Sequence, residues 1–277
     1  MSGGRGMRLI FACVLCLTAL TGGGHAAERF ITLASTTSTD NSGLFRHLLP
    51  KFTARTGITV RVVAVGTGAA LRLASRGDAD VVLVHAPEQE KNFVAAGHGI
   101  GRRAVMHNDF VMVGPRSDPA AIRGERSAMA VVTRLYGAKA LFASRGDKSG
   151  THTKERTLWQ SAGLDPQKFS GRWYLETGSG MGATLNFAAA RGAYTLADRA
   201  TWLAFRNKRG MVLLAEGDKR LANPYGLIVV NPARHPGIKD RDASVFANWL
   251  TGKEGQAAIA TFRINGKQVF FPDALSK

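Results

Sequence analysis

The stretch FITLASTTSTDNSGLFRHLLPKFTARTGITVRVVAVGTGAALRLASRGDADVVLVHAP, residues 30–87, decides the fold class of this chain. Short apolar runs rich in Val, Ile and Leu alternate in it with longer runs of helical pattern. The same alternation resumes between residues 140 and 217, from ALFASR to MVLLAEG. Strands that alternate with helices predict an α/β fold with a largely parallel sheet. The sequence shows no internal repeat of fixed period.

Two further apolar runs separate these α/β blocks, and each is closed by a proline: DFVMVGP at 109–115 and YGLIVVNP at 225–232. We interpret them as strands that cross between two lobes. The first lobe would then comprise residues 28–113 and 225–277, and the second lobe residues 114–224. The apolar helical pattern of residues 243–262 predicts segments that pack back on the first lobe.

The first 27 residues have the layout of a secretory signal peptide. Basic Arg5 and Arg8 precede the apolar run LIFACVLCLTAL at 9–20, and a stretch of small residues follows, ending at Ala26 and Ala27. The apolar run is shorter than the roughly 20 residues that a membrane-spanning helix needs. We therefore expect export, cleavage near Ala26 or Ala27, and a periplasmic mature chain.

Both cysteines, Cys13 and Cys16, lie inside that apolar run. The mature chain would then contain no thiol, disulfide or cysteine-ligated metal. A lipoprotein anchored at Cys13 is disfavoured, because bulky Phe11 stands where a small residue is expected. About 250 residues remain after cleavage, enough for one large or two ordinary domains.

The composition is strongly basic, with 37 Lys and Arg against 20 Asp and Glu and a formal net charge of +17. Without Arg5 and Arg8 the mature chain keeps 35 basic residues and a charge of +15. Such a field attracts anions. The basic residues are scattered through nearly every segment and form no single tract or binding motif, so we expect no nucleic-acid partner.

Three turns between a strand and a helix are rich in hydroxyls and glycines: STTST at 35–39, GTG at 66–68 and SRGDKSGTH at 144–152. A helix N-terminus binds anions through its unpaired N–H groups and the positive end of its dipole. Hydroxyls add donors, and Arg145 adds a guanidinium suited to two oxygens. Because ligands bind at the carboxyl ends of parallel strands, the turns predict one donor-rich anion site between two lobes. Taken singly, each turn is explained as well by helix capping or tight backbone geometry.

Eight segments resemble, in this order, the periplasmic tungstate-binding proteins of ABC importers: STTSTDNSGL, AVGTGAAL, GDADVVLVHAPE, HNDFVMVGP, SRGDKSGTHTKE, WYLETGSGMGATL, AYTLADRATWL and LLAEGD. The likeness covers almost the entire mature chain. It implies a type II-like, two-lobed periplasmic binding protein with two mixed or parallel sheets joined by two crossover strands, closing over tungstate or molybdate. It also implies a separate membrane permease and cytoplasmic ATPase as partners, a monomeric state, no cofactor and no enzymatic activity.

The resemblance also implies which residues hold the oxyanion. Thr36 matches the first-lobe hydroxyl ligand of the family, and Arg145 and Thr151 match its second-lobe ligands. The residues that share these turns, and that could donate through a side chain or the backbone, are Thr37, Ser38, Thr67, Ser149 and Gly150. Ser35 departs from the family pattern, which has a threonine there; it keeps the hydroxyl and loses a methyl group.

Phosphate or sulfate bound by the same fold is the first alternative. Phosphate often keeps a proton at neutral pH and benefits from a carboxylate acceptor, whereas tungstate, molybdate and sulfate carry no proton and need only donors. Asp147 could be that acceptor, or it could cap a helix and pair with Arg145. An exported hydrolase is disfavoured, because no serine has a lysine three residues on and no G-x-S-x-G elbow occurs.

Three remaining patterns are interpreted as structural. The GSGMG segment at 178–182 lacks the spacing of a dinucleotide loop, so we expect it to serve close helix packing and turn geometry, and a minor binding role stays open. His152 and Glu155 share a helical face without a third metal ligand, so we expect a solvated or capping pair and no metal site. The four tryptophans are expected to lie in the core.

Overall fold

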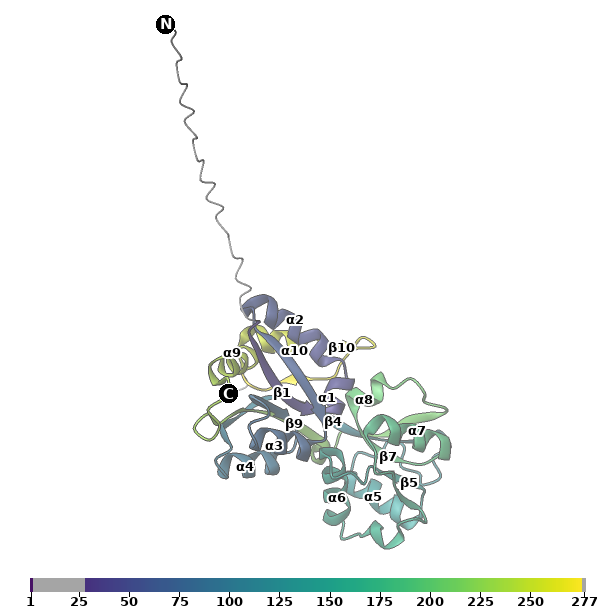
Figure 1. The fold of residues 1–277 in the computed structure, drawn as a ribbon. Coiled ribbons are helices and arrows are strands. Elements are labelled where there is room, and N and C mark those ends of the chain that lie inside the picture. The colour runs from purple at the N-terminus through teal and green to yellow at the C-terminus, as the bar shows by residue number, and fades with distance from the viewer. Residues whose placement is uncertain (2–27, 276–277) are drawn as a thin grey trace.

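The computed structural model describes Met1 and residues 28–275. It has two lobes, one formed by the beginning and end of the described chain and the other by its middle (Figure 1). The signal peptide predicted over residues 1–27 and its cleavage position lie outside the described residues. Within the described part, no helix has the length and apolar character needed to cross a membrane.

The elements divide between the lobes as follows. The first lobe contains β1 (Phe30–Thr36), α1 (Thr37–Asn41), α2 (Leu44–Thr56), β2 (Thr59–Val65), α3 (Thr67–Ser75), β3 (Val81–Val84), α4 (Pro87–Ala95), the first part of β4 (Gly99–Pro115), β9 (Ala222–Val230), α9 (Asp240–Thr251), α10 (Lys253–Thr261), β10 (Arg263–Ile264), β11 (Lys267–Gln268) and β12 (Phe271–Pro272). The second lobe contains the end of β4, α5 (Ala128–Gly137), β5 (Phe142–Ser144), α6 (Gly150–Ser161), the 3-10 helix η1 (Pro166–Phe169), β6 (Tyr174–Glu176), α7 (Met181–Arg191), β7 (Thr195–Asp198), α8 (Arg199–Ala204), β8 (Met211–Ala215) and the 3-10 helix η2 (Lys219–Leu221).

The first-lobe sheet has the strand order β12-β4-β9-β3-β1-β2. β1 pairs in parallel with β2 on one side and with β3 on the other, whereas β9 and β12 run antiparallel to their neighbours. All four residues of β3, VVLV, are buried, as expected for a strand covered on both faces. Because β1 lies between β2 and β3, the carboxyl ends of these three strands open at one crevice.

The second lobe uses a similar arrangement with shorter strands. β5 pairs in parallel with β6, and Phe142 on its other side forms a parallel bridge to Tyr194, which leads into β7. β7 and β8 pair antiparallel with the end of β4. One long strand, β4, therefore belongs to both sheets. The two-lobed α/β fold class predicted from the sequence is confirmed.

The second predicted crossover, at 225–232, coincides largely with β9. β9 begins at Ala222, directly after η2, and pairs with β3 and with the first part of β4. Leu221 is buried in the second-lobe core, so the chain leaves that lobe at this residue. The packing of Leu221 and the pairing of β9 together show where the second lobe ends, which the sequence around Leu221 does not indicate.

Each lobe has its own hydrophobic core. In the first, Phe52 of α2 meets Phe246 of α9 edge to face, with ring centroids 5.0 Å apart, so the C-terminal helices pack back on the first sheet. In the second, Phe142 of β5 meets Trp159 of α6, with centroids 5.4 Å apart. α8 connects the lobes: it follows a second-lobe strand, yet its Ala200 is buried in the first-lobe core.

Candidate anion-binding cleft

The carboxyl ends of strands from both lobes face each other where the lobes meet, and we call this region the cleft. In the first lobe β1 ends at Thr36, and Thr67 begins α3 just after β2; in the second lobe Arg145 follows β5 and Gly150 begins α6. The lobes touch here, because a Cβ built on Gly150 would lie 3.4 Å from Thr67 Oγ1 and 3.0 Å from Cε1 of His85. The fold therefore brings the turns at 66–68 and 144–152 into contact across the cleft.

The first-lobe turn is built around the cap of α1. Thr36 is 3% exposed, and its Oγ1 accepts a hydrogen bond from the backbone N–H of Thr39 at 3.3 Å. Ser38 is also buried, with its Oγ 3.1 Å from Thr36 Oγ1, and Thr37 is half-buried. Ser35, by contrast, donates to a carbonyl of β3 at 2.6 Å. Its hydroxyl therefore serves the sheet and does not face the cleft.

Thr67 and Thr151 stand in the first turns of α3 and α6, one from each lobe. Their exposures are 0% and 1%. Among the residues that the structure describes, neither hydroxyl has a hydrogen-bond partner. Buried polar groups are nearly always hydrogen-bonded, and leaving one unpaired costs about 1–3 kcal/mol. These two hydroxyls therefore indicate a place where a hydrogen-bond acceptor binds.

Arg145 is held in place within its own lobe. It is 4% exposed, its Nε donates to the carbonyl of Ser179 at 3.3 Å, and its Nη2 pairs with Asp147. Asp147 Oδ1 accepts from the backbone N–H of Ser149 at 3.1 Å. Ser149 in turn caps α6, because its Oγ accepts from the backbone N–H of His152 at 3.3 Å. The guanidinium has five N–H donors, so this arrangement orients the group and leaves donors for an anion.

The loop around Arg145 requires an unusual backbone. Gly146 has a φ of 61°, a conformation that favours glycine, and a Cβ there would lie 3.0 Å from the Cβ of Glu176. Ser179 completes the loop, since its N–H donates to the carbonyl of Arg145 at 3.2 Å. The GSGMG segment at 178–182 thus positions Arg145 through Ser179, a role that its glycine pattern alone does not reveal.

His85 lies in the cleft and was missed by sequence reasoning. It directly follows β3 and is 5% exposed, with Nε2 3.3 Å from Ser38 Oγ and Nδ1 2.9 Å from Asn223 Oδ1. Burial, reinforced by the charge of Arg145, lowers the pKa of His85 to about 4, so the ring is neutral at neutral pH. His85 directly follows β3, and a position directly after a parallel strand is what marked the other turns as candidates in the sequence.

Asp198 is a second residue that was missed. It ends β7, is 1% exposed, and caps α8 by accepting from the backbone N–H of Thr201 at 2.9 Å. Burial raises the pKa of Asp198, and the charge of Arg145 acts in the opposite direction. The carboxyl groups of Asp198 and Asp147 are therefore both close enough to Arg145 to offset part of its positive charge inside the second lobe.

The expectation of a solvated or capping pair at His152 and Glu155 is wrong for Glu155. That carboxyl is 3% exposed and accepts a hydrogen bond from the hydroxyl of Tyr174 at 2.6 Å, because α6 packs this face on the second-lobe core. Burial raises the pKa of Glu155 to about 7. His152 Nδ1 accepts from the backbone N–H of Lys148 at 3.0 Å. Within residues 28–275, no three potential metal-ligating side chains of His, Cys, Asp or Glu form a group.

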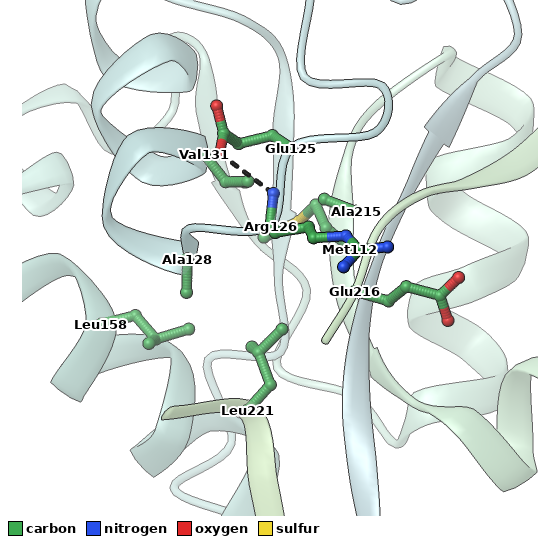
Figure 2. A pocket seen from close by; sticks show the side chains of 9 residues that line it. All are labelled: Met112, Glu125, Arg126, Ala128, Val131, Leu158, Ala215, Glu216 and Leu221. Atoms are coloured by element: carbon green, nitrogen blue, oxygen red, sulfur yellow. Dashed lines mark hydrogen bonds between the residues drawn. The ribbon is translucent and has the colours of Figure 1, made fainter. Parts of the chain in front are cut away.

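The pocket drawn in Figure 2 lies inside the second lobe and not in the cleft. Apolar side chains such as Met112, Val131 and Leu158 line most of it, and its volume of about 10 Å³ has room for about one water molecule. A larger space of about 270 Å³ lies between the start of α4 and α6. His85 lines this second space, so the space borders the cleft at this residue.

Two α/β lobes that share a strand and face each other with helix N-termini define a two-lobed solute-binding protein. The family model of the PBP superfamily domain matches residues 21–254 of the chain, so the fold and the sequence agree on this class.

Three relatives indicate which family of solute-binding proteins the chain resembles in sequence. The tungstate-binding protein TupA of Peptoclostridium acidaminophilum is 42% identical over 252 residues, which cover 90% of this chain and 87% of that protein. The solved structure of TupA from Desulfovibrio alaskensis is 43% identical with a TM-score of 0.78, covering 88% of this chain and 99% of that one. The structure of the tungstate ABC transporter protein from Geobacter sulfurreducens is 48% identical with a TM-score of 0.79, covering 85% and 100%.

The chain belongs to the family of tungstate-binding proteins of ABC transporters. Members of this family are binding proteins of transporters and not enzymes, which confirms the prediction that the chain is not an enzyme.

Proposed function

We propose that this chain captures tungstate in the cleft between its lobes and delivers it to an ABC importer, made of a membrane permease and a cytoplasmic ATPase on separate chains. The observation that carries the proposal is the pair of buried hydroxyls of Thr67 and Thr151, which come from opposite lobes and have no partner among the described residues. The family membership supplies the identity of the anion.

The eight predicted ligands would contribute in different ways. Thr67 and Thr151 would donate through their free hydroxyls, and Arg145 through the N–H groups that Asp147 and Ser179 leave unused. Ser149 would donate its O–H, because its backbone N–H is already bonded to Asp147. Thr36, Thr37, Ser38 and Gly150 stand at the starts of α1 and α6, whose first N–H groups have no partner within the helix.

Asp147 is not free to be the acceptor that a protonated phosphate needs. One carboxylate oxygen of Asp147 pairs with Arg145 and the other accepts from Ser149. Both oxygens of Asp147 therefore already have a donor from the protein. A carboxylate that accepts the proton of a phosphate would need one oxygen without such a donor. Tungstate and molybdate differ too little in size and charge for these contacts to separate them, so we propose molybdate as a second ligand.

Titration calorimetry of the mature chain with tungstate, molybdate, sulfate and phosphate tests the proposal. We expect tungstate to bind more tightly than sulfate and phosphate, with molybdate nearest to it. If tungstate and molybdate bind no tighter than sulfate, the assignment fails. Repeating the titration at several salt concentrations tests the nucleic-acid alternative, because a polyanion-binding protein loses affinity steeply as salt rises and a single buried anion site is screened less.

We propose further that the mature chain is periplasmic and monomeric, with cleavage near Ala26 or Ala27. Cell fractionation followed by intact-mass measurement tests the location, and recovery of the complete 277-residue chain from the cytoplasm would contradict it. Sedimentation of the purified chain tests the monomeric state.

A further inference from the structure

His85 contacts three separate parts of the cleft. Its Nε2 lies 3.3 Å from Ser38 Oγ in the first-lobe turn, and its Nδ1 lies 2.9 Å from Asn223 Oδ1 on β9. Its ring also lies against the start of α6, since a Cβ on Gly150 would be 3.0 Å from Cε1 and 3.2 Å from Nδ1. This side chain therefore joins a predicted anion-binding turn, a strand between the lobes and the helix of the opposite lobe.

A chain of amides sets which ring nitrogen carries the proton. Asn108 of β4 and Asn223 of β9 stand opposite each other in register, and Asn223 Nδ2 donates to Asn108 Oδ1 at 2.7 Å. The remaining polar atom of Asn223 is its oxygen, an acceptor, so His85 Nδ1 must donate to it. A neutral imidazole has one donor and one acceptor. His85 Nε2 is therefore the acceptor, and the hydroxyl of Ser38 donates to it.

Burial and the nearby charges favour the neutral form of the ring and outweigh the hydrogen bond to Asn223, which acts in the opposite direction. The side chain is 5% exposed, Tyr225 packs on it with ring centroids 4.8 Å apart, and the charged groups facing it, Arg145 and Lys154, are both cationic. A cationic imidazolium would add a third positive charge in a buried space and would leave Nε2 without a lone pair for Ser38.

We propose that His85 is a positioning residue of the anion site: its Nε2 accepts a hydrogen bond from the hydroxyl of Ser38, and the ring ties the first-lobe turn to the paired asparagines of β4 and β9. This inference rests on the oxyanion function proposed above. With its O–H turned toward His85, Ser38 presents its oxygen to Thr36, whose Oγ1 lies 3.1 Å away. The hydroxyls of the turn are thereby ordered before the ligand arrives, which lowers the cost of ordering them on binding.

A double-mutant cycle on tungstate affinity tests the link between His85 and Ser38. His85→Asn places an amide near Nδ1 and keeps a donor for Asn223 but no acceptor for Ser38, whereas His85→Gln places its oxygen near Nε2 and keeps that acceptor. We expect His85→Asn and Ser38→Ala each to weaken binding about fivefold to tenfold. The double variant should bind little worse than either single variant, and His85→Gln should keep more affinity than His85→Asn.

Additive losses in the cycle, or equal affinities of the Asn and Gln variants, would overturn the inference, because a residue that only stabilises the fold shows no coupling to Ser38 in binding. His235→Asn is the matched control: His235 Nε2 lies 3.0 Å from a carbonyl of α3, away from the cleft, and affinity should stay at the wild-type level. Absence of tungstate binding by the wild-type chain would instead reject the proposed function. The same double-mutant cycle, measured with the anion that does bind, would then test the coupling between His85 and Ser38.

Nitrogen NMR of the wild-type chain provides a test that needs no variant. With uniformly labelled protein at neutral pH, we expect His85 to show a protonated Nδ1 and an unprotonated Nε2. If the side-chain amides of Asn108 and Asn223 both had their oxygen and nitrogen exchanged, the protonated ring nitrogen would be Nε2 and the Ser38 hydroxyl would be the acceptor. That spectrum would overturn the inference even if every His85 variant failed to fold.

Discussion

Gly150 at the start of α6 lies directly against Thr67 at the start of α3, so two helix N-termini from opposite lobes meet without a side chain between them. A Cβ on Gly150 would lie 3.4 Å from Thr67 Oγ1 and 3.0 Å from Cε1 of His85. The second distance is tighter than ordinary van der Waals contact. The close approach of the lobes at this point therefore depends on the hydrogen side chain of Gly150.

Gly150→Ala is expected to weaken tungstate binding about tenfold, because the added methyl must displace α6 from the first lobe, and overpacking costs about 1–3 kcal/mol. Gly150 is not among the residues with positive φ, so backbone strain does not contribute. Gly182→Ala is the control, since nothing lies within 4 Å of its added Cβ. Calorimetry that shows the same affinity for both variants would contradict the close contact.

Thr67→Val and Thr151→Val should affect stability and affinity in opposite directions. Each removes a buried hydroxyl that has no partner among the described residues, so the anion-free chain should be as stable as wild type or more so. Tungstate binding should weaken about fivefold to twentyfold in each variant. Thermal unfolding and calorimetry on the same samples measure the two effects.

Thr195→Val is the matched control for these two substitutions. Its hydroxyl is also fully buried but donates to the carbonyl of Ala143 at 2.7 Å. We expect it to lower the free energy of unfolding by about 1–3 kcal/mol without changing the affinity. A Thr67 or Thr151 variant that behaves like Thr195→Val would show that these hydroxyls are structural.

Arg145→Ala is expected to reduce tungstate affinity at least about thirtyfold, because loss of one partner of a buried charged contact costs about 2–5 kcal/mol. Arg145→Lys should recover only part, since an ammonium lacks the planar fork of the guanidinium. Arg126→Ala, at an exposed arginine, removes the same net charge and should leave the affinity close to wild type. Circular dichroism checks folding, and retained affinity in Arg145→Ala would remove the main predicted ligand.

Glu155→Gln should stabilise the protein above neutral pH and lose this effect in acid. The buried Glu155 has its pKa raised from 4.5 to about 7, so the folded state binds this proton more tightly than the unfolded state. Wild-type stability from this group is fully present below pH 4.5 and is lost as pH rises to 7. Glutamine carries no charge, so the variant avoids a loss on the order of 1–3 kcal/mol.

Unfolding in denaturant at pH 5 and at pH 8 measures this difference. Glu254→Gln is the control, because that carboxylate is exposed and only weakly paired with Arg55 at 3.5 Å. We expect its effect on stability to be small at both pH values. If the free energies of unfolding of Glu155→Gln and wild type differ by the same amount at both pH values, Glu155 keeps its ordinary pKa.

Part of the candidate site could be predicted from local pattern. Thr36, Thr67 and Arg145 each follow an apolar run and precede a helical one, and this strand-to-helix position is readable from the sequence. His85 occupies the same position after VVLV. It was missed because HAPE contains no hydroxyl or glycine cluster, and a single histidine carries no pattern of its own.

The burial of residues on two short helices, α8 and α6, could not be predicted from the sequence. Ala200 follows a second-lobe strand and yet lies in the first-lobe core, and Glu155 lies on a helix of polar composition and yet is buried. Both outcomes depend on which surfaces of α8 and α6 meet another element. Hydrophobic periodicity does not report this for short helices with few apolar residues.

The sequence by itself determined the alternation of strands and helices, the two lobes and the donor-rich turns, because these features depend on periodicity and turn chemistry within a few residues. Tertiary structure decided what each hydroxyl contacts: Ser35 donates to a carbonyl of β3, Ser38 lies beside His85, and Thr67 and Thr151 have no partner in the described part of the chain. Identical O–H groups differ only in what the fold places beside them. The contacts of His85 span 47 and 138 residues, and strand register over such separations is not readable from local sequence.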